Sequence, residues 1–312
     1  MTHVQHFTEH GYVDFGPIIS PDVCSTLKRK ILATRDFGPR LFMAREDFER
    51  LQPDAFNKNP RPGANLLDDL SLDAKPVLET PLLKAFLVDL LGPNYQILRR
   101  KLVCGVPRSW LPEWIHEKIE GRPSNNLAHF VRPEYTDITY FYGIDYHQDL
   151  VDWRDREPDF VTIYVYIDDV TDSKSPLFLL PRTFEAGAAT FPHQLRRIDS
   201  ETGRWEYTTP TGGRLYRDEI MLTRPQGSVF GWHPLTLHGT QPTTAREPRV
   251  SMRFLIARDP NAETCELDRA NQRIRGPRRM TTTRVDLDAK GHAKIEKNAL
   301  YEAKHGPLPR AQ

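Results

Sequence analysis

The sequence predicts a mainly β fold with flanking helices, of the sandwich or barrel type. Several short segments rich in β-branched and aromatic residues follow one another closely in residues 160–257, with turn residues between them. Only two stretches, residues 20–34 and 80–91, combine strong helix-start signals with an apolar stripe of helical period. Strands and helices do not alternate along the chain, so a parallel sheet of βαβ units is not expected.

Length and composition indicate one soluble globular domain. The 312 residues are enough to bury a large core, and the hydrophobic and charged fractions, 38% and 27%, are typical of globular proteins. We expect a single domain over residues 1–312, with a core at about 7–257, a lid or insert at 107–142 and a C-terminal extension at 260–312.

Charge, cysteine content and hydropathy exclude several protein classes. A formal net charge of +1 argues against nucleic acid or an anionic membrane as a partner. The three cysteines, Cys24, Cys104 and Cys265, form neither a disulfide framework nor a zinc pattern, which fits a reducing compartment. The apolar runs are shorter than the ~18 residues of a membrane helix, and the N-terminal residues lack a signal-peptide pattern. We therefore expect a cytoplasmic protein, whose oligomeric state the sequence does not predict.

The first third of the chain contains the predicted helices. Residues 12–15 form a short strand, and Ser20 then caps a helix that runs to about Thr34. Residues 36–75 are expected to be loop, with one short helix near 44–51. Thr80 and Pro81 start a second helix, which Gly92 and Pro93 end. A strand over residues 95–106 follows.

Residues 107–142 combine many aromatic residues with prolines and show weak periodicity. Long irregular segments in a compact domain tend to be functional covers, and the aromatic content argues against disorder. We interpret this segment as a lid or substrate loop. The alternative is an insertion packed on the surface.

The remaining elements are short strands. We expect them at residues 160–167, 177–180, 218–222, 228–232, 236–241 and 249–257. Residues 193–215 are polar and are expected to form an exposed excursion. Beyond Pro260 the chain is polar and basic, and the arginines at 273, 275, 278 and 279 are interpreted as a solvated surface or, alternatively, as a cover over an anionic substrate.

Candidate metal ligands surround the segment 146–150. If this segment is a strand, His147 and Asp149 project from the same face and could share one divalent metal ion. Alone, such a pair is more often solvated or hydrogen-bonded. His238 is the best third ligand, because two histidines and one carboxylate form the facial set of non-haem Fe(II) oxygenases. His233 would face away from His238 in an alternating strand, and the histidines at 3, 6 and 10 are interpreted as solvated.

A candidate anion-binding pair follows His238. Arg249 comes eleven residues later, and Ser251 faces the same way two residues further on. The planar guanidinium suits a carboxylate, and the distal carboxylate of a metal-chelating 2-oxo acid would need such a fixed cation. Without the three metal ligands, the pair would be interpreted as an ordinary strand with a surface arginine.

The sequence resembles the phytanoyl-CoA dioxygenase family of Fe(II)/2-oxoglutarate-dependent oxygenases over roughly residues 7–257. The resemblance rests on six motifs in order rather than on any single one. They are Gly11-Tyr12-Val13 with Ile19-Ser20-Pro21-Asp22-Val23; Leu91-Gly92-Pro93-Asn94; His147-Gln148-Asp149-Leu150; Asp168-Asp169-Val170-Thr171; Pro176-Leu177 with Leu180-Pro181; and His238-Gly239 with Arg249.

The resemblance implies a double-stranded β-helix, a jelly-roll with helices outside. It implies Fe(II) held by His147, Asp149 and His238, and 2-oxoglutarate and O2 as co-substrates, with Arg249 on the distal carboxylate and Ser251 assisting. Two family features differ. Ser173-Lys174-Ser175 and Pro181-Arg182-Thr183-Phe184 replace the usual turn sequences, and a lysine common before the lid is absent, with Lys101 as a possible substitute.

The activity that the resemblance implies is hydroxylation of an unactivated C–H bond in a small molecule, with succinate and CO2 as co-products. Related halogenases lack the carboxylate ligand, so Asp149 argues against halogenation. We expect a substrate of secondary metabolism, free or carrier-bound. The candidate substrate residues are Trp110, Trp114, Arg132, Tyr140, Tyr142 and Trp153. The alternatives are a metal-dependent hydrolase on a cupin-like barrel and a non-catalytic member of the family.

Overall fold

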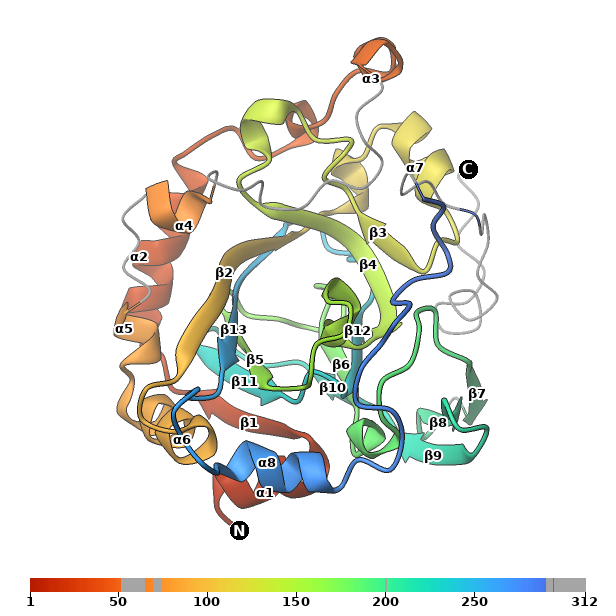
Figure 1. Ribbon diagram of the computed structural model, residues 1–312. Helices are drawn as coiled ribbons and strands as arrows, with labels where there is room; N and C mark the ends of the chain where they lie inside the picture. The colour runs from red at the N-terminus through yellow and green to blue at the C-terminus, as the bar shows by residue number, and fades with distance from the viewer. Residues whose placement is uncertain (52–64, 70–74, 200, 290–293, 295–312) are drawn as a thin grey trace.

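The core of the protein is one large curled sheet of ten strands (Figure 1). The computed structural model describes residues 1–51, 65–69, 75–199, 201–289 and 294. Nine strands follow the order β1-β11-β5-β13-β2-β4-β12-β6-β10, and β3 pairs with β4 off this path. Their bounds are β1 Tyr12–Pro17, β2 Gln96–Gly105, β3 Ser124–Asn126, β4 Thr139–His147, β5 Phe160–Tyr166, β6 Leu177–Leu180, β10 Ile220–Leu222, β11 Ser228–Trp232, β12 Leu237–Thr240 and β13 Arg249–Ala257.

The sheet is mixed, and its curl gives the predicted jelly-roll. Most neighbours pair antiparallel, but β2 and β4 pair parallel and join the part containing β13, β5 and β11 to the part containing β12 and β6. In Figure 1 these two parts surround a common interior. The prediction of a mainly β, double-stranded β-helix fold is confirmed.

The helices lie outside the sheet rather than in its interior, and α3 (Arg45–Leu51) projects away from it (Figure 1). Their bounds are α1 His3–His10, α2 Pro21–Leu32, α3 Arg45–Leu51, α4 Leu66–Asp69, α5 Lys75–Leu78, α6 Pro81–Leu91, α7 Glu113–Ile119 and α8 Glu266–Gln272. The Ser20 hydroxyl accepts from Val23 N and so caps α2 as predicted. The Thr80 hydroxyl instead donates to the Pro76 carbonyl, 3.1 Å away, so α6 starts without a side-chain cap.

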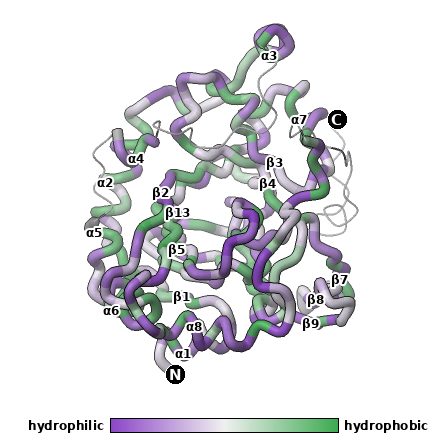
Figure 2. Tube along the Cα trace, viewed as in Figure 1, coloured by the Kyte–Doolittle hydropathy of each residue, from purple (hydrophilic) through white to green (hydrophobic). Residues whose placement is uncertain are grey.

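The two faces of the sheet carry different side chains. On β13, Val250, Met252 and Phe254 join the leucines of α6 in what we call the helix-side core. The alternate residues face the interior, where an apolar barrel-side cluster lies. This cluster consists of Val103, Phe141, Tyr164, Tyr166, Val170, Leu177, Leu179, Leu222, Phe230 and Trp232. Hydrophilic and hydrophobic residues accordingly mix along β2 (Figure 2).

Several expectations about local structure need correction. The expected exposed excursion at residues 193–215 contains a three-stranded sheet, β7 Leu195–Asp199, β8 Arg204–Thr208 and β9 Arg214–Asp218. Its buried residues Trp205 and Tyr207 pack on the outside of β6 and β12. Helices α1 and α8 were not expected; a capping box of Thr2 with Gln5 begins α1, and Gly11 in the left-handed conformation ends it.

The segment 107–142 is folded into the domain. It contains α7, β3 and the first residues of β4, and two short 3-10 helices at Arg108–Trp110 and Pro133–Tyr135. Ile115, Ile119 and Phe130 are buried in the helix-side core. Its role as a lid stays a prediction. Among the described residues, no helix is long and apolar enough to cross a membrane.

Candidate metal and co-substrate site

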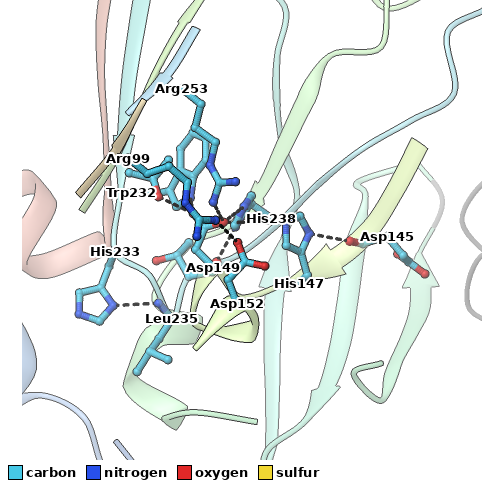
Figure 3. Close-up of polar contacts among 12 residues, drawn as sticks. Arg99, Asp145, His147, Asp149, Asp152, Trp232, His233, Leu235, His238 and Arg253 are labelled. Atoms are coloured by element: carbon cyan, nitrogen blue, oxygen red, sulfur yellow. Dashed lines mark hydrogen bonds and ion pairs between the residues drawn. The ribbon is translucent and has the colours of Figure 1, made fainter. Parts of the chain in front are cut away.

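The structure brings the three predicted metal ligands together at one end of the barrel interior (Figure 3). His147 ends β4 and lies directly opposite His238 of β12 in the antiparallel register, with ring centroids 4.2 Å apart. Asp149 Oδ1 lies 3.4 Å from His238 Nε2 and 4.0 Å from His147 Nε2. The strand expected through Leu150 ends at His147 instead, and Asp149 begins a 3-10 turn, Asp149–Asp152.

Backbone carbonyl groups orient both imidazoles. His147 Nδ1 lies 3.0 Å from the Asp145 carbonyl oxygen, and His238 Nδ1 lies 2.9 Å from that of Thr236. A carbonyl oxygen only accepts hydrogen bonds, so Nδ1 carries the proton in each ring. With the proton on Nδ1, the lone pair that a metal could use is on Nε2, the atom of each ring that lies near Asp149. This is the arrangement in which histidines serve as metal ligands.

The Asp149 carboxylate is buried and held by three side chains. Trp232 Nε1 donates to Oδ2 over 2.9 Å, and the Thr162 hydroxyl donates to the same oxygen. Arg253 donates to Oδ1. Burial alone would raise the pKa of Asp149, but Arg253 and the neighbouring histidines outweigh it and hold this pKa well below the usual value. Asp149 is therefore ionised at neutral pH, as a metal ligand must be.

Gln148 lies between the candidate ligands His147 and Asp149, in what we call the ligand loop (residues 147–152). Its side chain hydrogen-bonds this loop to two other segments. Its buried amide donates to the Gly187 and Leu235 carbonyls over 2.9 and 3.0 Å, and it accepts from Ala189 N over 2.9 Å. Leu235 lies three residues before His238. The Gln148 amide therefore connects the ligand loop to the segment that leads into the third candidate ligand. The sequence analysis did not single out this residue, although its place between two ligands was a signal.

Arg249 and Ser251 lie in the same interior. Arg249 is fully buried; it donates to the Ser175 carbonyl and to the Tyr164 hydroxyl over 2.9 Å. Its guanidinium carbon also lies 5.1 Å from the centroid of the Phe141 ring. Nε of Arg249 and the hydroxyl of buried Ser251 have no hydrogen-bond partner among the residues that the structure describes. Buried donors without partners are rare in native proteins, and a bound carboxylate would satisfy them.

The residues present fit an iron ion and a 2-oxo acid. Two imidazole nitrogens and one carboxylate oxygen, all within 4.8 Å of one another, are the donor set of non-haem Fe(II) sites. Arg249 and Ser251 supply donors for a carboxylate, and no carboxylate pairs with Arg249 among the described residues. The ligand and co-substrate assignments remain proposals.

Additional cations border Asp149. Lys101 of β2 pairs in register with Arg253 of β13, and Arg99 Nη1 lies 3.4 Å from Asp152 Oδ2. Burial and the charge of Arg253 lower the pKa of Lys101 to about 7. Neither Arg99 nor Arg253 was expected in the site, although Arg253 lies two residues after Ser251 in the same predicted strand and so shares its face.

The predicted substrate residues occupy two different regions. Tyr140 and Tyr142 are members of the helix-side core, and Trp110 and Trp114 pack against it, so the structure does not bring these four rings into the barrel-side cluster. Arg132 donates from Nε to the Phe42 carbonyl over 3.3 Å. Trp153 follows the ligand loop directly.

The Trp153 ring lies beside two guanidinium groups. The guanidinium carbon of Arg99 is 5.1 Å from the ring centroid, and that of Arg156 is 5.2 Å from it. Of the six candidates, Trp153 is therefore the one whose contacts lead to the cations bordering Asp149.

The other basic and histidine candidates have structural partners. His233 is buried, bonds Asn271 through Nε2 over 2.9 Å and accepts from Leu235 N at Nδ1 over 3.2 Å. Burial lowers its pKa to about 4. In the basic cluster, Arg273 pairs with Glu185 over 2.8 Å and Arg279 with Glu157 over 2.6 Å. These contacts agree with a solvated surface on which the arginines form ion pairs.

Fold and site together define a jelly-roll protein in which two histidines and one carboxylate could hold a single metal ion. The sequence model of the phytanoyl-CoA dioxygenase (PhyH) family matches residues 7–251. This match covers most of the chain, and the protein belongs to that family.

The individual proteins that resemble this chain match it over part of its length or at low sequence identity. L-proline trans-4-hydroxylase of Streptomyces griseoviridis is 30% identical over 118 residues, which are 33% of this chain and 44% of the hydroxylase; the match thus spans less than half of that relative. Among solved structures, the non-heme alpha ketoglutarate dependent epimerase SnoN from nogalamycin biosynthesis has 11% identity and a TM-score of 0.49, covering 82% of both chains. AviO1 from Streptomyces viridochromogenes Tue57 has 15% identity and a TM-score of 0.44, covering 84% of this chain and 96% of AviO1.

Proposed function

We propose that this protein is a non-haem Fe(II)/2-oxoglutarate-dependent dioxygenase that hydroxylates an unactivated C–H bond of a small molecule. The observation that carries the proposal is the convergence of His147 Nε2, His238 Nε2 and Asp149 Oδ1, with both Nδ1 atoms bonded to carbonyls. Membership of the phytanoyl-CoA dioxygenase family supports it.

Each part of the site has a defined task in this reaction. His147, Asp149 and His238 would hold the iron, and Arg249 and Ser251 would bind the distal carboxylate of 2-oxoglutarate. The bound iron supplies the activation of O2 that is coupled to oxidative decarboxylation of the co-substrate to succinate and CO2. The aromatic barrel-side cluster excludes water from the buried Arg249, which strengthens its attraction for a carboxylate.

The substrate is proposed to be a small molecule of secondary metabolism. The curated relative is named as a hydroxylase of L-proline, a small amino acid, which supports a small substrate for this chain. Trp153 is the candidate ring nearest to the ligand loop in sequence, and the segment 107–142 is proposed as the cover of the site. The intact carboxylate ligand, Asp149, favours hydroxylation over halogenation.

A metal-dependent hydrolase is the second candidate function. The same three ligands could hold zinc and activate water. A hydrolase would have no use for a buried arginine and serine whose Nε and hydroxyl lack partners. These two residues therefore favour the oxygenase.

The decisive experiment is anaerobic addition of Fe(II) and then 2-oxoglutarate to the full-length protein. We expect the weak visible metal-to-ligand charge-transfer band of a chelated 2-oxo acid. The band should be absent in His147→Ala, weakened in Arg249→Ala, and unchanged in His10→Ala, a matched histidine variant on α1. If the wild-type protein gives no band and retains a different metal, the oxygenase is wrong and the hydrolase replaces it.

A further inference from the structure

Three cationic side chains extend the site along the interior edges of β2 and β13. Lys101 and Arg253 are direct partners in the antiparallel register of these strands. Val103, two residues after Lys101, belongs to the barrel-side cluster, and side chains two apart in a strand share a face. Arg253 contacts Asp149 directly, and in Figure 3 Arg99 and Arg253 both extend toward Asp149. Lys101 and Arg253 therefore face the interior beside the metal ligands.

The three cations are unequally paired. Arg253 donates to Asp149, and Arg99 lies 3.4 Å from Asp152. Lys101 is only 8% exposed, and no hydrogen bond or ion pair is found for its ammonium group among the described residues, although its nitrogen is not one of the atoms fully shielded from solvent. An unpaired buried cation is unfavourable unless something else supplies the counter-charge. With its pKa lowered to about 7 by burial, Lys101 therefore offers the interior an amino group that a bound anion would keep protonated.

The iron ion and the 2-oxoglutarate of the proposed site would not neutralise the positive charges of Lys101 and Arg253. An Fe(II) ion with the Asp149 carboxylate carries one net positive charge, and 2-oxoglutarate with Arg249 carries one net negative charge. These two sums cancel. Because Asp149 then serves the metal, Arg253 and Lys101 have no dedicated anion, while Asp152 pairs with Arg99. At close range in a poorly hydrated interior, two such cations attract an anion strongly.

Resting on the function proposed above, we propose that Lys101 and Arg253 form an anion subsite beside the metal that binds the carboxylate of the small-molecule substrate. The co-substrate's distal carboxylate already has Arg249 and Ser251, whose Nε and hydroxyl lack partners. The subsite is a second, separate anion position. Holding the substrate there would fix which of its C–H bonds faces the iron.

The subsite can be tested with acetate as the probe and acetamide as its neutral, similarly sized control. The full-length protein is loaded anaerobically with Fe(II) and 2-oxoglutarate, and its melting temperature is followed during titration at constant ionic strength. Acetate, but not acetamide, should raise the melting temperature of the wild type, because a ligand that binds only the folded state stabilises it.

Substitutions on one strand locate the response. Lys101→Gln should weaken the acetate response about tenfold, as expected for the loss of one charge-assisted hydrogen bond. Lys101→Arg should keep it. Arg100→Gln is the matched control, because Arg100 is the next residue of β2 and pairs with Asp68 at the surface. Equal responses to acetate and acetamide, or an acetate response that Lys101→Gln leaves unchanged, would overturn the proposal.

Two further observations separate the possible sources of failure. If a higher concentration of 2-oxoglutarate abolishes the acetate response, acetate occupies the co-substrate position and the separate subsite is wrong. If wild-type protein gives no charge-transfer band, the proposed oxygenase function fails. A normal band without a Lys101-dependent acetate response removes the subsite alone.

Discussion

The part of the barrel interior around the candidate metal ligands, which we call the metal end, differs from the part around Arg249 and Ser251, the arginine end. The difference is in how the polar groups of each part are hydrogen-bonded. At the metal end, every donor atom is oriented: the Nδ1 atoms of His147 and His238 bond carbonyls, and Asp149 accepts from Thr162, Trp232 and Arg253. At the other end, Arg249 Nε and the Ser251 hydroxyl are buried without partners.

This difference distinguishes a site completed by the protein from a site completed by a ligand. Hydrogen bonds from neighbouring groups to the metal ligands fix the direction of these ligands before the metal binds. Orphaned donors at the arginine end are unfavourable until a carboxylate accepts from them. Substitutions at the metal end should therefore change stability and metal binding together, whereas substitutions at the arginine end should change co-substrate binding and leave metal binding unchanged.

The largest effect is expected for Asp149→Ala. It removes one metal ligand and leaves the Arg253 guanidinium and Trp232 Nε1 without their acceptor. Breaking a buried pair on one side typically costs about 3 kcal/mol of unfolding free energy. We expect loss of Fe(II) binding, measured by equilibrium dialysis, and a destabilisation of about that size in denaturant titrations.

A double substitution separates the two consequences. Arg253→Met added to Asp149→Ala removes the stranded cation, so part of the lost stability should return while Fe(II) binding stays absent. If Asp149→Ala leaves the unfolding free energy unchanged, the comparison of the two ends is wrong at the metal end.

Arg249→Lys should have the next largest effect. Lysine keeps the charge but lacks the planar fork of donors and cannot reproduce the contacts to Ser175 and Tyr164. The dissociation constant for 2-oxoglutarate should rise by about tenfold or more, followed through the charge-transfer band. Fe(II) affinity should be unchanged, and a parallel loss of Fe(II) affinity would contradict the division between the two ends.

Gln148→Ala should produce a smaller effect at the metal end. The amide makes three hydrogen bonds, to Gly187, Ala189 and Leu235, that hold the ligand loop. Groups that orient metal ligands are typically worth about 10-fold in metal affinity. We expect a loss of about that size in Fe(II) dialysis. Arg132→Ala, whose lost side chain donates to the Phe42 carbonyl, serves as the comparison and should bind Fe(II) as the wild type does.

The sequence predicted the strands that are rich in β-branched and aromatic residues, and the three ligands that the structure brings together. β13 and β6 have the expected bounds, because their composition is unambiguous and turn residues flank them. The three candidate ligands could be singled out because they lie in two short motifs, His147-Gln148-Asp149-Leu150 and His238-Gly239, and the strands that carry these motifs, β4 and β12, pair directly.

Contacts between distant segments could not be predicted in this way. Nothing in the sequence around Gln148 indicates that its amide reaches Gly187. Strand alternation puts Arg253 on the face of Ser251 but does not indicate that its guanidinium contacts Asp149. The sheet β7–β8–β9 was missed because its polar, partly exposed residues resemble a loop. In each case tertiary packing, rather than local propensity, determines the role of the residue.

The smallest effect, and the sharpest test of the arginine end, is expected for Ser251→Ala. The Ser251 hydroxyl is buried and has no partner, so removing it should leave the protein as stable or slightly more stable. The same substitution removes one donor from a bound carboxylate, so the dissociation constant for 2-oxoglutarate should rise several-fold, by about 1 kcal/mol of binding free energy. Thermal unfolding without ligand and titration of the charge-transfer band measure the two quantities. A loss of stability without a loss of 2-oxoglutarate affinity would mean that the serine serves the fold and not the ligand.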